Sequence, residues 1–212
     1  MTSRGRYAAL LLGPGLLAGL LAAGASAAEP PGDATRGAAL FTVKGCGRCH
    51  VPGERGQGMG PALSAIRRPQ GMLELSGRLW NHAPGMFAAF AKEGLQWPDL
   101  TPEQMADLAA YLQAEPSRDP APDLFKGRVT LVRKGCLKCH RLQGEGGPVA
   151  IELATYHGRY ESPIRWAAAV WNHAPRMATL SAQLDVLYPR FSGDEMANLF
   201  EFLKSTAAAA RK

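Results

Sequence analysis

The sequence predicts an all-α fold of two tandem helical domains, for three reasons. The 212-residue chain repeats itself at an offset of 90 to 91 positions over most of its length. Apolar residues recur mainly at helical spacing, and long β-branched runs are scarce. The 24 glycines and 16 prolines favour many loops and turns between short helices.

The N-terminal segment has the pattern of a signal peptide for export. Arg4 and Arg6 give a positive start, an apolar run follows, and residues 25–27 (Ala-Ser-Ala) offer a cleavage site. The apolar run is short for a membrane span, and Gly-Pro-Gly interrupts it. We therefore expect residues 1–28 to be a signal peptide and the mature chain to be periplasmic, with no stable membrane span.

The repeat divides the rest of the chain into two domains. The first is predicted at residues 29–115 and the second at residues 123–212. Residues 116–122 contain three prolines, which is typical of a semi-rigid linker that keeps neighbouring domains close. Each domain is near the lower size limit for independent folding, so a bound group is expected to supply part of its core.

The first helix of each domain is predicted at about 33–43 and about 123–133. Asp33 and Asp123 stand at the N-cap, where a carboxylate accepts hydrogen bonds from the unpaired N–H groups of the first turn.

A middle and a last helix are predicted to follow in each domain. The middle helices lead to a Trp-Asn-His-Ala-Pro segment at residues 80–84 and 171–175, where the proline is expected to break the helix. The last helices begin near residues 101–103 (Thr-Pro-Glu) and 192–194 (Ser-Gly-Asp).

A Cys-x-x-Cys-His motif follows the first helix of each domain. This spacing is the attachment signature for haem c, because two thiols form thioethers with the porphyrin vinyl groups and the next histidine binds the iron. Paired cysteines can also form disulfides, a redox dithiol or a zinc site, but these uses do not explain a histidine in both copies. The residues expected to hold two covalent haems and their iron are Cys46, Cys49, His50, Cys136, Cys139 and His140.

The surroundings of both motifs resemble class I c-type cytochromes. Gly37 on the first helix, a Gly-Pro-x-Leu segment after the motif and a Leu-x-x-Tyr-Leu segment on the last helix support this resemblance. In that family the first and last helices cross closely. The resemblance therefore implies that Gly37 faces Tyr111, and that Gly127 faces Phe202.

The sixth ligand of each iron has two candidates. The family normally uses a methionine from the loop before the last helix, and Met86 and Met177 occupy that region. His82 and His173 recur four residues earlier and are the alternatives. A methionine ligand raises the reduction potential relative to a second histidine, and the resemblance favours the methionines.

Two further pairs of residues receive roles near the porphyrin. The resemblance implies that Pro61 and Pro148 contact the region of the motif histidine. Trp80 and Trp171 are expected to pack on the porphyrin or to seal its edge, where an amphipathic ring fits well.

These observations predict a dihaem c-type cytochrome that carries single electrons and has no catalytic residue. Its partners would be periplasmic or membrane-bound redox proteins, and no basic run with interleaved aromatic residues suggests nucleic acid. One alternative is the electron-accepting cytochrome subunit of a periplasmic dehydrogenase or other oxidoreductase complex. Another is a dihaem peroxidase, which would need a vacant position on one iron. The second domain is more basic, so we expect it to dock the more acidic partner, near Lys134 and Lys138.

Overall fold

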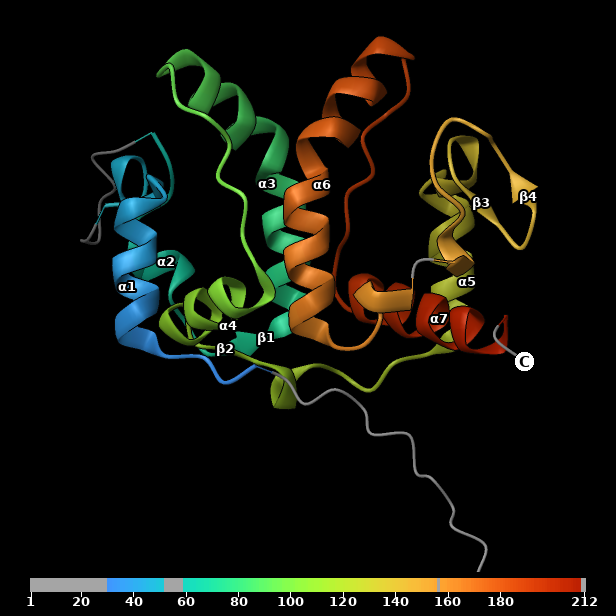
Figure 1. Ribbon diagram of the computed structural model, residues 1–212, viewed down its shortest axis with the longest axis horizontal. Coiled ribbons are helices and arrows are strands. Elements are labelled where there is room, and N and C mark those ends of the chain that lie inside the picture. Colours follow the sequence, from blue (N-terminus) through green and yellow to red (C-terminus); the bar gives the residue numbers. More distant parts are fainter. Residues whose placement is uncertain (1–29, 52–58, 156, 211–212) are drawn as a thin grey trace, which may run out of the picture.

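The computed structural model describes residues 30–51, 59–155 and 157–210. The predicted signal peptide, residues 1–28, lies outside these ranges. The described chain is mostly helical and forms two similar halves, with the long helices α3 and α6 lying side by side between them (Figure 1).

Equivalent elements follow one another in the same order in both halves. The first half contains α1 (Ala34–Val43), the 3₁₀ turn η1 (Cys46–Arg48), α2 (Leu63–Ile66), α3 (Met72–Lys92) and α4 (Pro102–Tyr111). The second half contains α5 (Leu124–Arg133), the 3₁₀ turns η3 (Cys136–Lys138), η4 (Leu153–Thr155) and η5 (His157–Arg159), and helices α6 (Pro163–Gln183) and α7 (Glu195–Ala209).

The strands among the described residues are only two residues long. The parallel pair joins β1 (Gln70–Gly71) to β2 (Ala114–Glu115), and the antiparallel pair joins β3 (Arg141–Leu142) to β4 (Glu145–Gly146). Neither pair provides a sheet on which helices could pack, so the core lies between helices.

The predicted N-caps of the first helices are confirmed. The Asp33 carboxylate accepts a hydrogen bond from the Arg36 N–H at 2.7 Å, and Asp123 accepts one from the Lys126 N–H at 3.0 Å. Thr101 and Gln104 cap α4 reciprocally, whereas α7 begins at Glu195, slightly later than its sequence indicates.

The first and last helices of each half cross at a glycine, as expected. A β-carbon on Gly37 would overlap the backbone oxygen of Asp107 and lie 2.7 Å from the Tyr111 β-carbon. A β-carbon on Gly127 would likewise lie 2.6 Å from the Phe202 β-carbon. The absence of a side chain therefore lets the two helix backbones approach closely.

The prolines of the middle helices do not end them, which corrects the expectation from the sequence. Helix α3 continues through Pro84 to Lys92, and α6 continues through Pro175 to Gln183. A proline removes one helical hydrogen bond and bends the helix. The buried residues just before the prolines, Ala83 and Ala174, anchor the helices, whose far ends splay apart (Figure 1).

The hydrophobic cores of the two halves are interleaved. The first core combines Phe41 and Met105 with residues of α6, including Ala167 and Trp171. The second core combines Leu131 of α5 and several residues of α7 with Leu73, Trp80 and Ala83 of α3. Each long helix therefore contributes apolar residues to both cores.

The linker is attached to the first half. It begins with the 3₁₀ turn η2 (Pro116–Arg118), after which the Asp119 carboxylate accepts a hydrogen bond of 2.7 Å from the N–H of Leu73, in the first turn of α3. Within the described residues, no helix has both the length and the apolar character required to cross a bilayer.

Candidate functional site

Each Cys-x-x-Cys-His motif is formed by a short turn directly after the first helix of its half. Gly45 and Gly135 precede the turns with φ of 82° and 72°, values that glycine adopts without strain. In both turns the N–H of the motif histidine donates to the carbonyl of the first cysteine at 3.0 Å. None of the four motif cysteines forms a disulfide.

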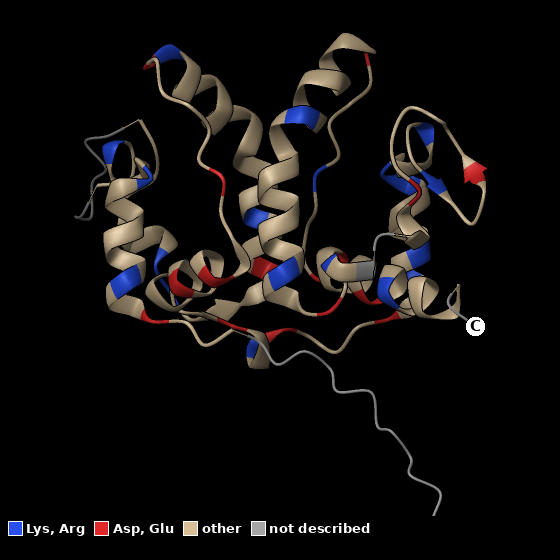
Figure 2. Cartoon of the chain, in the orientation of Figure 1, with Lys and Arg blue, Asp and Glu red and all other residues tan. Residues whose placement is uncertain are grey.

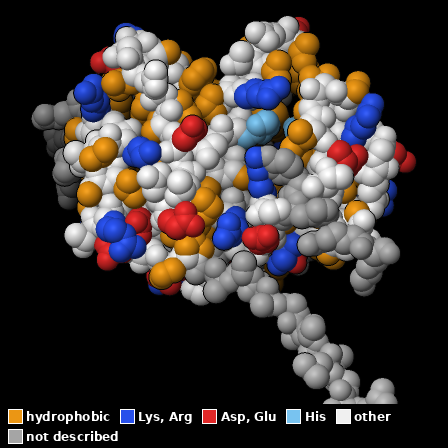
Figure 3. All heavy atoms as spheres, in the orientation of Figure 1, with side chains coloured by type: hydrophobic (Ala, Val, Ile, Leu, Met, Phe, Trp, Pro, Cys, Tyr) orange, Lys and Arg blue, Asp and Glu red, His pale blue; other side chains and the backbone are white. Residues whose placement is uncertain are grey.

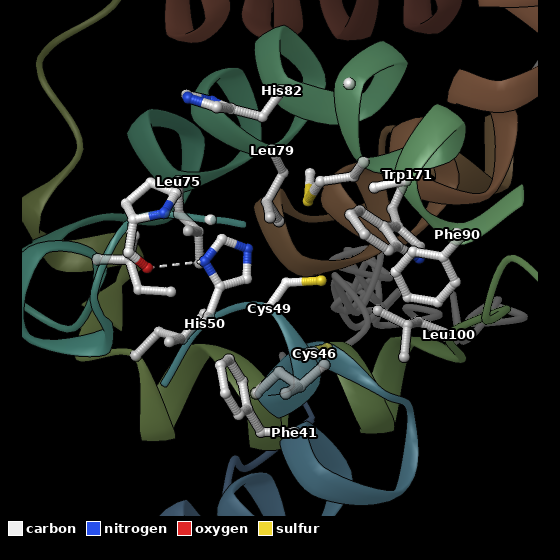
Figure 4. A pocket seen from close by; sticks show the side chains of 18 of the residues that line it. Phe41, Cys46, Cys49, His50, Leu75, Leu79, His82, Phe90, Leu100 and Trp171 are labelled. Carbon is white, nitrogen blue, oxygen red and sulfur yellow. Dashed lines mark hydrogen bonds between the residues drawn. The ribbon is translucent and has the colours of Figure 1, made fainter. Parts of the chain in front are cut away.

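In the first half, the motif opens onto a cavity of about 320 Å³ (Figure 4). Cys46, Cys49 and His50 lie along one side, and the other walls are mainly apolar, with contributions from α3 and α4. Burial raises the pKa of the Cys46 thiol to about 11. Cys46 is half-buried, and it lines the mainly apolar cavity.

The second half has an equivalent but smaller cavity of about 100 Å³, lined by Cys136 and His140. Its walls contain larger side chains: Trp166 and Phe191 stand where the repeat places Leu75 and Leu100 in the first half. Burial also raises the pKa of the Cys136 thiol to about 11.

One backbone carbonyl orients the ring of each motif histidine. The Nδ1 of His50 lies 3.0 Å from the Pro61 carbonyl oxygen, and the Nδ1 of His140 lies 3.0 Å from that of Ile151. When Nδ1 donates this bond, Nε2 carries a lone pair that can bind a metal. The expectation for Pro61 is confirmed, but in the second half Ile151 takes this place instead of Pro148. Ile151 lies 90 positions after Pro61, which is the offset between the two motifs. The glycine-proline pair at 147–148 does not lie at this offset from Gly60 and Pro61.

In the first half, Met86 and His82 both line the cavity, but they differ in exposure. Met86 is half-buried and packs against the first core. His82 is exposed, its Nδ1 lies 2.8 Å from the Arg78 carbonyl oxygen, and its ring is turned away from His50 (Figure 4). Both methionine candidates belong to long helices rather than to loops.

In the second half, the histidine candidate faces inward. The ring centre of His173 lies 6.1 Å from that of His140, and its Nε2 is buried without a hydrogen-bond partner among the described residues. Burial, and to a smaller extent the neighbouring His140, lowers the pKa of His173 to about 4. Met177 lines the same cavity. Met177 and His173 therefore both stay candidate ligands.

The two tryptophans line cavities as expected, but each lines the cavity of the other half. Trp171 of α6 lies in the wall of the first cavity, beside Phe90 and Leu100 (Figure 4), and Trp80 of α3 lines the second. The sequence repeat did not reveal this exchange, because a residue has the same repeat position whichever half it faces.

The basic residues expected to dock a partner are not equally available. The Lys134 ammonium lies 2.7 Å from the Glu195 carboxylate and 5.9 Å from the Phe191 ring centre, so it is engaged within the fold. Lys138 is exposed. Lys and Arg are frequent on α5 and the turn after it (Figure 2), while charges of both signs are scattered over the face shown in Figure 3.

Residues 34–115 match the family model Cytochrome c, and this match covers the first repeat, with its motif and all the lining residues of its cavity except Trp171. The family is one of electron-transfer proteins that bind haem c covalently. No curated protein and no solved structure gives a significant match to the chain.

Proposed function

We propose that the protein is a periplasmic dihaem c-type cytochrome that carries single electrons between redox partner proteins. The two domains would span residues 29–115 and 123–212, joined by the linker at 116–122. The observation that carries the proposal is the duplication of a complete site. Two thiols, an imidazole with its Nε2 available and an apolar cavity recur at matching positions in both halves.

The residues present fit a covalently attached haem. Cys46 and Cys49 would form the thioethers in the first half, and Cys136 and Cys139 in the second. Cys46, Cys49 and His50 line the first cavity, Cys136 and His140 line the second, and the other walls of both are mainly apolar, as a porphyrin requires. When bound, haem c supplies an iron that gains and loses one electron.

The chain itself orients the motif histidines. The carbonyls of Pro61 and Ile151 fix the ring orientation of His50 and His140, the proposed axial ligands on the motif side. On the opposite side we propose Met86 and Met177, with His82 and His173 as the alternatives. The predicted signal peptide, residues 1–28, supports a periplasmic location.

Haem content is the direct test of this function. Protein matured in a host that attaches haem c is expected to carry two haems per chain, measured by the pyridine haemochrome assay. The double variant Cys136→Ala/Cys139→Ala should carry one haem, and the matched variant Cys46→Ala/Cys49→Ala should also carry one.

The carrier role predicts that both haems take up and release one electron each in a reversible titration. The reduced protein should then be reoxidised by a small redox protein without added substrate. A colourless protein, or a haem content that does not change in the cysteine variants, would overturn the proposal.

A further inference from the structure

Trp80 and Trp171 stand at equivalent positions of the repeat, and each leaves its own half. Trp171 belongs to α6 of the second half, yet it lines the cavity that contains Cys46 and His50. Trp80 belongs to α3 of the first half, yet it lines the cavity that contains Cys136 and His140. Both side chains are buried: Trp171 has 6% of its surface exposed and Trp80 has 7%. Each cavity therefore has a wall residue supplied by the other half.

Specific contacts fix Trp171 in this position. Its Nε1–H donates a hydrogen bond of 2.7 Å to the carbonyl of Pro98, in the first half. Its ring stacks on that of Trp97, with ring centres 4.1 Å apart and planes inclined by 26°. A buried indole N–H needs such an acceptor, so the hydrogen bond and the stacking together define one orientation of the ring.

The equivalent contacts hold Trp80 against the second half. Its Nε1–H donates to the Pro189 carbonyl at 2.8 Å, and its ring stacks on Tyr188 at 5.0 Å. Tyr188 stands at the repeat position of Trp97, and Pro189 at that of Pro98. Because the arrangement occurs twice with different aromatic partners, it is a property of the duplicated fold and not of one local packing.

The asparagine after each tryptophan also forms hydrogen bonds with the other half. Asn172 accepts a hydrogen bond from the Leu100 N–H and donates one to the Leu100 carbonyl, both at 2.9 Å. Asn81 makes the same two bonds with Phe191, at 2.8 and 2.6 Å. Leu100 lines the first cavity and Phe191 lines the second. Each long helix therefore also holds a wall segment of the opposite cavity in place.

A second tryptophan on α6 shows that this helix serves both cavities. Trp166 lines the cavity of its own half, and its Nε1 lies 3.3 Å from the Met196 sulfur. Residues five positions apart on an α-helix are separated by about 140° around its axis. Trp166 and Trp171 therefore leave α6 on different faces, one toward each cavity.

We infer that each haem site is built from both halves of the chain, with Trp171 as a positioning residue for the haem of the first half and Trp80 for that of the second. This inference rests on the proposed function. The burial and packing around a haem contribute to its reduction potential. A change at Trp171 should therefore alter the potential of the haem attached to Cys46 and Cys49, which lies in the other half.

The test compares two tryptophans of the same helix in the protein that carries both haems. Cys46→Ala/Cys49→Ala and Cys136→Ala/Cys139→Ala first assign the two midpoint potentials, because each leaves one haem. Potentials and Soret circular dichroism are then measured for Trp171→Leu and for the matched variant Trp166→Leu. Trp166→Leu introduces the residue that the first half has at this repeat position, Leu75.

We expect Trp171→Leu to shift the potential and the Soret signal of the first-half haem, and Trp166→Leu to shift those of the second-half haem. Trp80→Leu should give the mirror result of Trp171→Leu. Trp171→Phe keeps an aromatic ring and loses the N–H, so it should shift the same haem less if the leucine variant folds poorly.

The inference is overturned if Trp171→Leu and Trp171→Phe change only the second-half haem, or neither haem. Haem content is measured in every sample and keeps the two proposals apart. A wild-type protein without haem contradicts the proposed function, whereas two attached haems that do not respond across the halves contradict this inference alone.

Discussion

Gly37 and Gly127 determine how closely the first and last helices of each half approach. A β-carbon at either position would meet a backbone oxygen of the facing helix, at Asp107 or Asn198, which cannot move as a flexible side-chain end can. These crossings lie beside the cavities, since Phe41, one turn after Gly37, lines the first cavity. A single methyl group would therefore disturb both the fold and the site.

We expect Gly37→Ala to destabilise the protein by about 1–3 kcal/mol, the usual cost of overpacking a tight contact. Thr35→Ala, at an exposed position of the same helix, should change stability by no more than about 0.5 kcal/mol. Urea unfolding of the holoprotein, followed by far-ultraviolet circular dichroism, measures both. Equal stability of the two variants would show that α1 and α4 do not cross at Gly37.

The histidine candidate for the sixth ligand is placed differently in the two halves, so loss of the methionine should affect the two haems differently. The His82 ring is exposed and turned away from His50, so in the proposed dihaem protein Met86→Leu should leave the first iron without a sixth ligand from the chain. His173 lies beside His140, so Met177→Leu should leave the second iron with a histidine available. Carbon monoxide binding and the spin state of the iron distinguish these outcomes.

Met86→Leu is expected to bind carbon monoxide at one of its two haems, and Met177→Leu at neither. His82→Ala serves as the control and should retain the wild-type spectrum, because this side chain is exposed. Carbon monoxide binding to the same extent in both methionine variants would refute the difference between the halves.

Among the elements, α3 and α6 form the connection between the halves. Two hydrogen bonds join Asn172 to the backbone of Leu100, which is buried. Asn172 itself is exposed and both bonds are part-buried, so each is expected to contribute about 0.5–1.5 kcal/mol, as a typical intramolecular hydrogen bond does.

Loss of both bonds in Asn172→Ala is therefore expected to lower the free energy of unfolding by about 1–3 kcal/mol. Asn81→Ala, which loses the equivalent bonds to Phe191, should have a similar effect. Thr179→Ala lies on the same helix and loses only a bond to the Pro175 carbonyl of that helix, so it is the control. Denaturant unfolding of the three variants measures the effect, and an Asn172→Ala protein as stable as the control would contradict it.

Much of this element order follows from the sequence, while the exchange between the halves does not. The caps at Asp33, Asp123 and Thr101 were predictable, because capping depends on residues close in sequence. The continuation of α3 through Pro84 was not, since tertiary packing outweighs the local cost of the proline. The repeat predicts equivalent positions but not which half a side chain faces. Only the structure therefore shows that Trp171 lines the cavity of the first half.

For the whole molecule, the α3–α6 contacts predict that the covalent linker is not needed to hold the halves together. A specific protease site inserted between Pro120 and Ala121, both exposed, would allow the folded chain to be cut. We expect the two halves to elute together in size-exclusion chromatography after cleavage.

The same cut in the double variant Asn81→Ala/Asn172→Ala should release the halves more readily, because four hydrogen bonds between them are lost. Separation of the halves after cleavage without these substitutions would show that the linker, and not the helix pair, maintains the assembly.

The crossed tryptophans also constrain how the two copies could diverge after duplication. Trp171 stacks on Trp97 and Trp80 stacks on Tyr188, so each aromatic pair has one member in each copy. A substitution that suits one copy must be compatible with a ring encoded in the other. We therefore expect that a half transplanted from a related protein would be accommodated only when the facing ring is transplanted as well. The gene segments for the two halves would accordingly evolve as one unit and not as interchangeable modules.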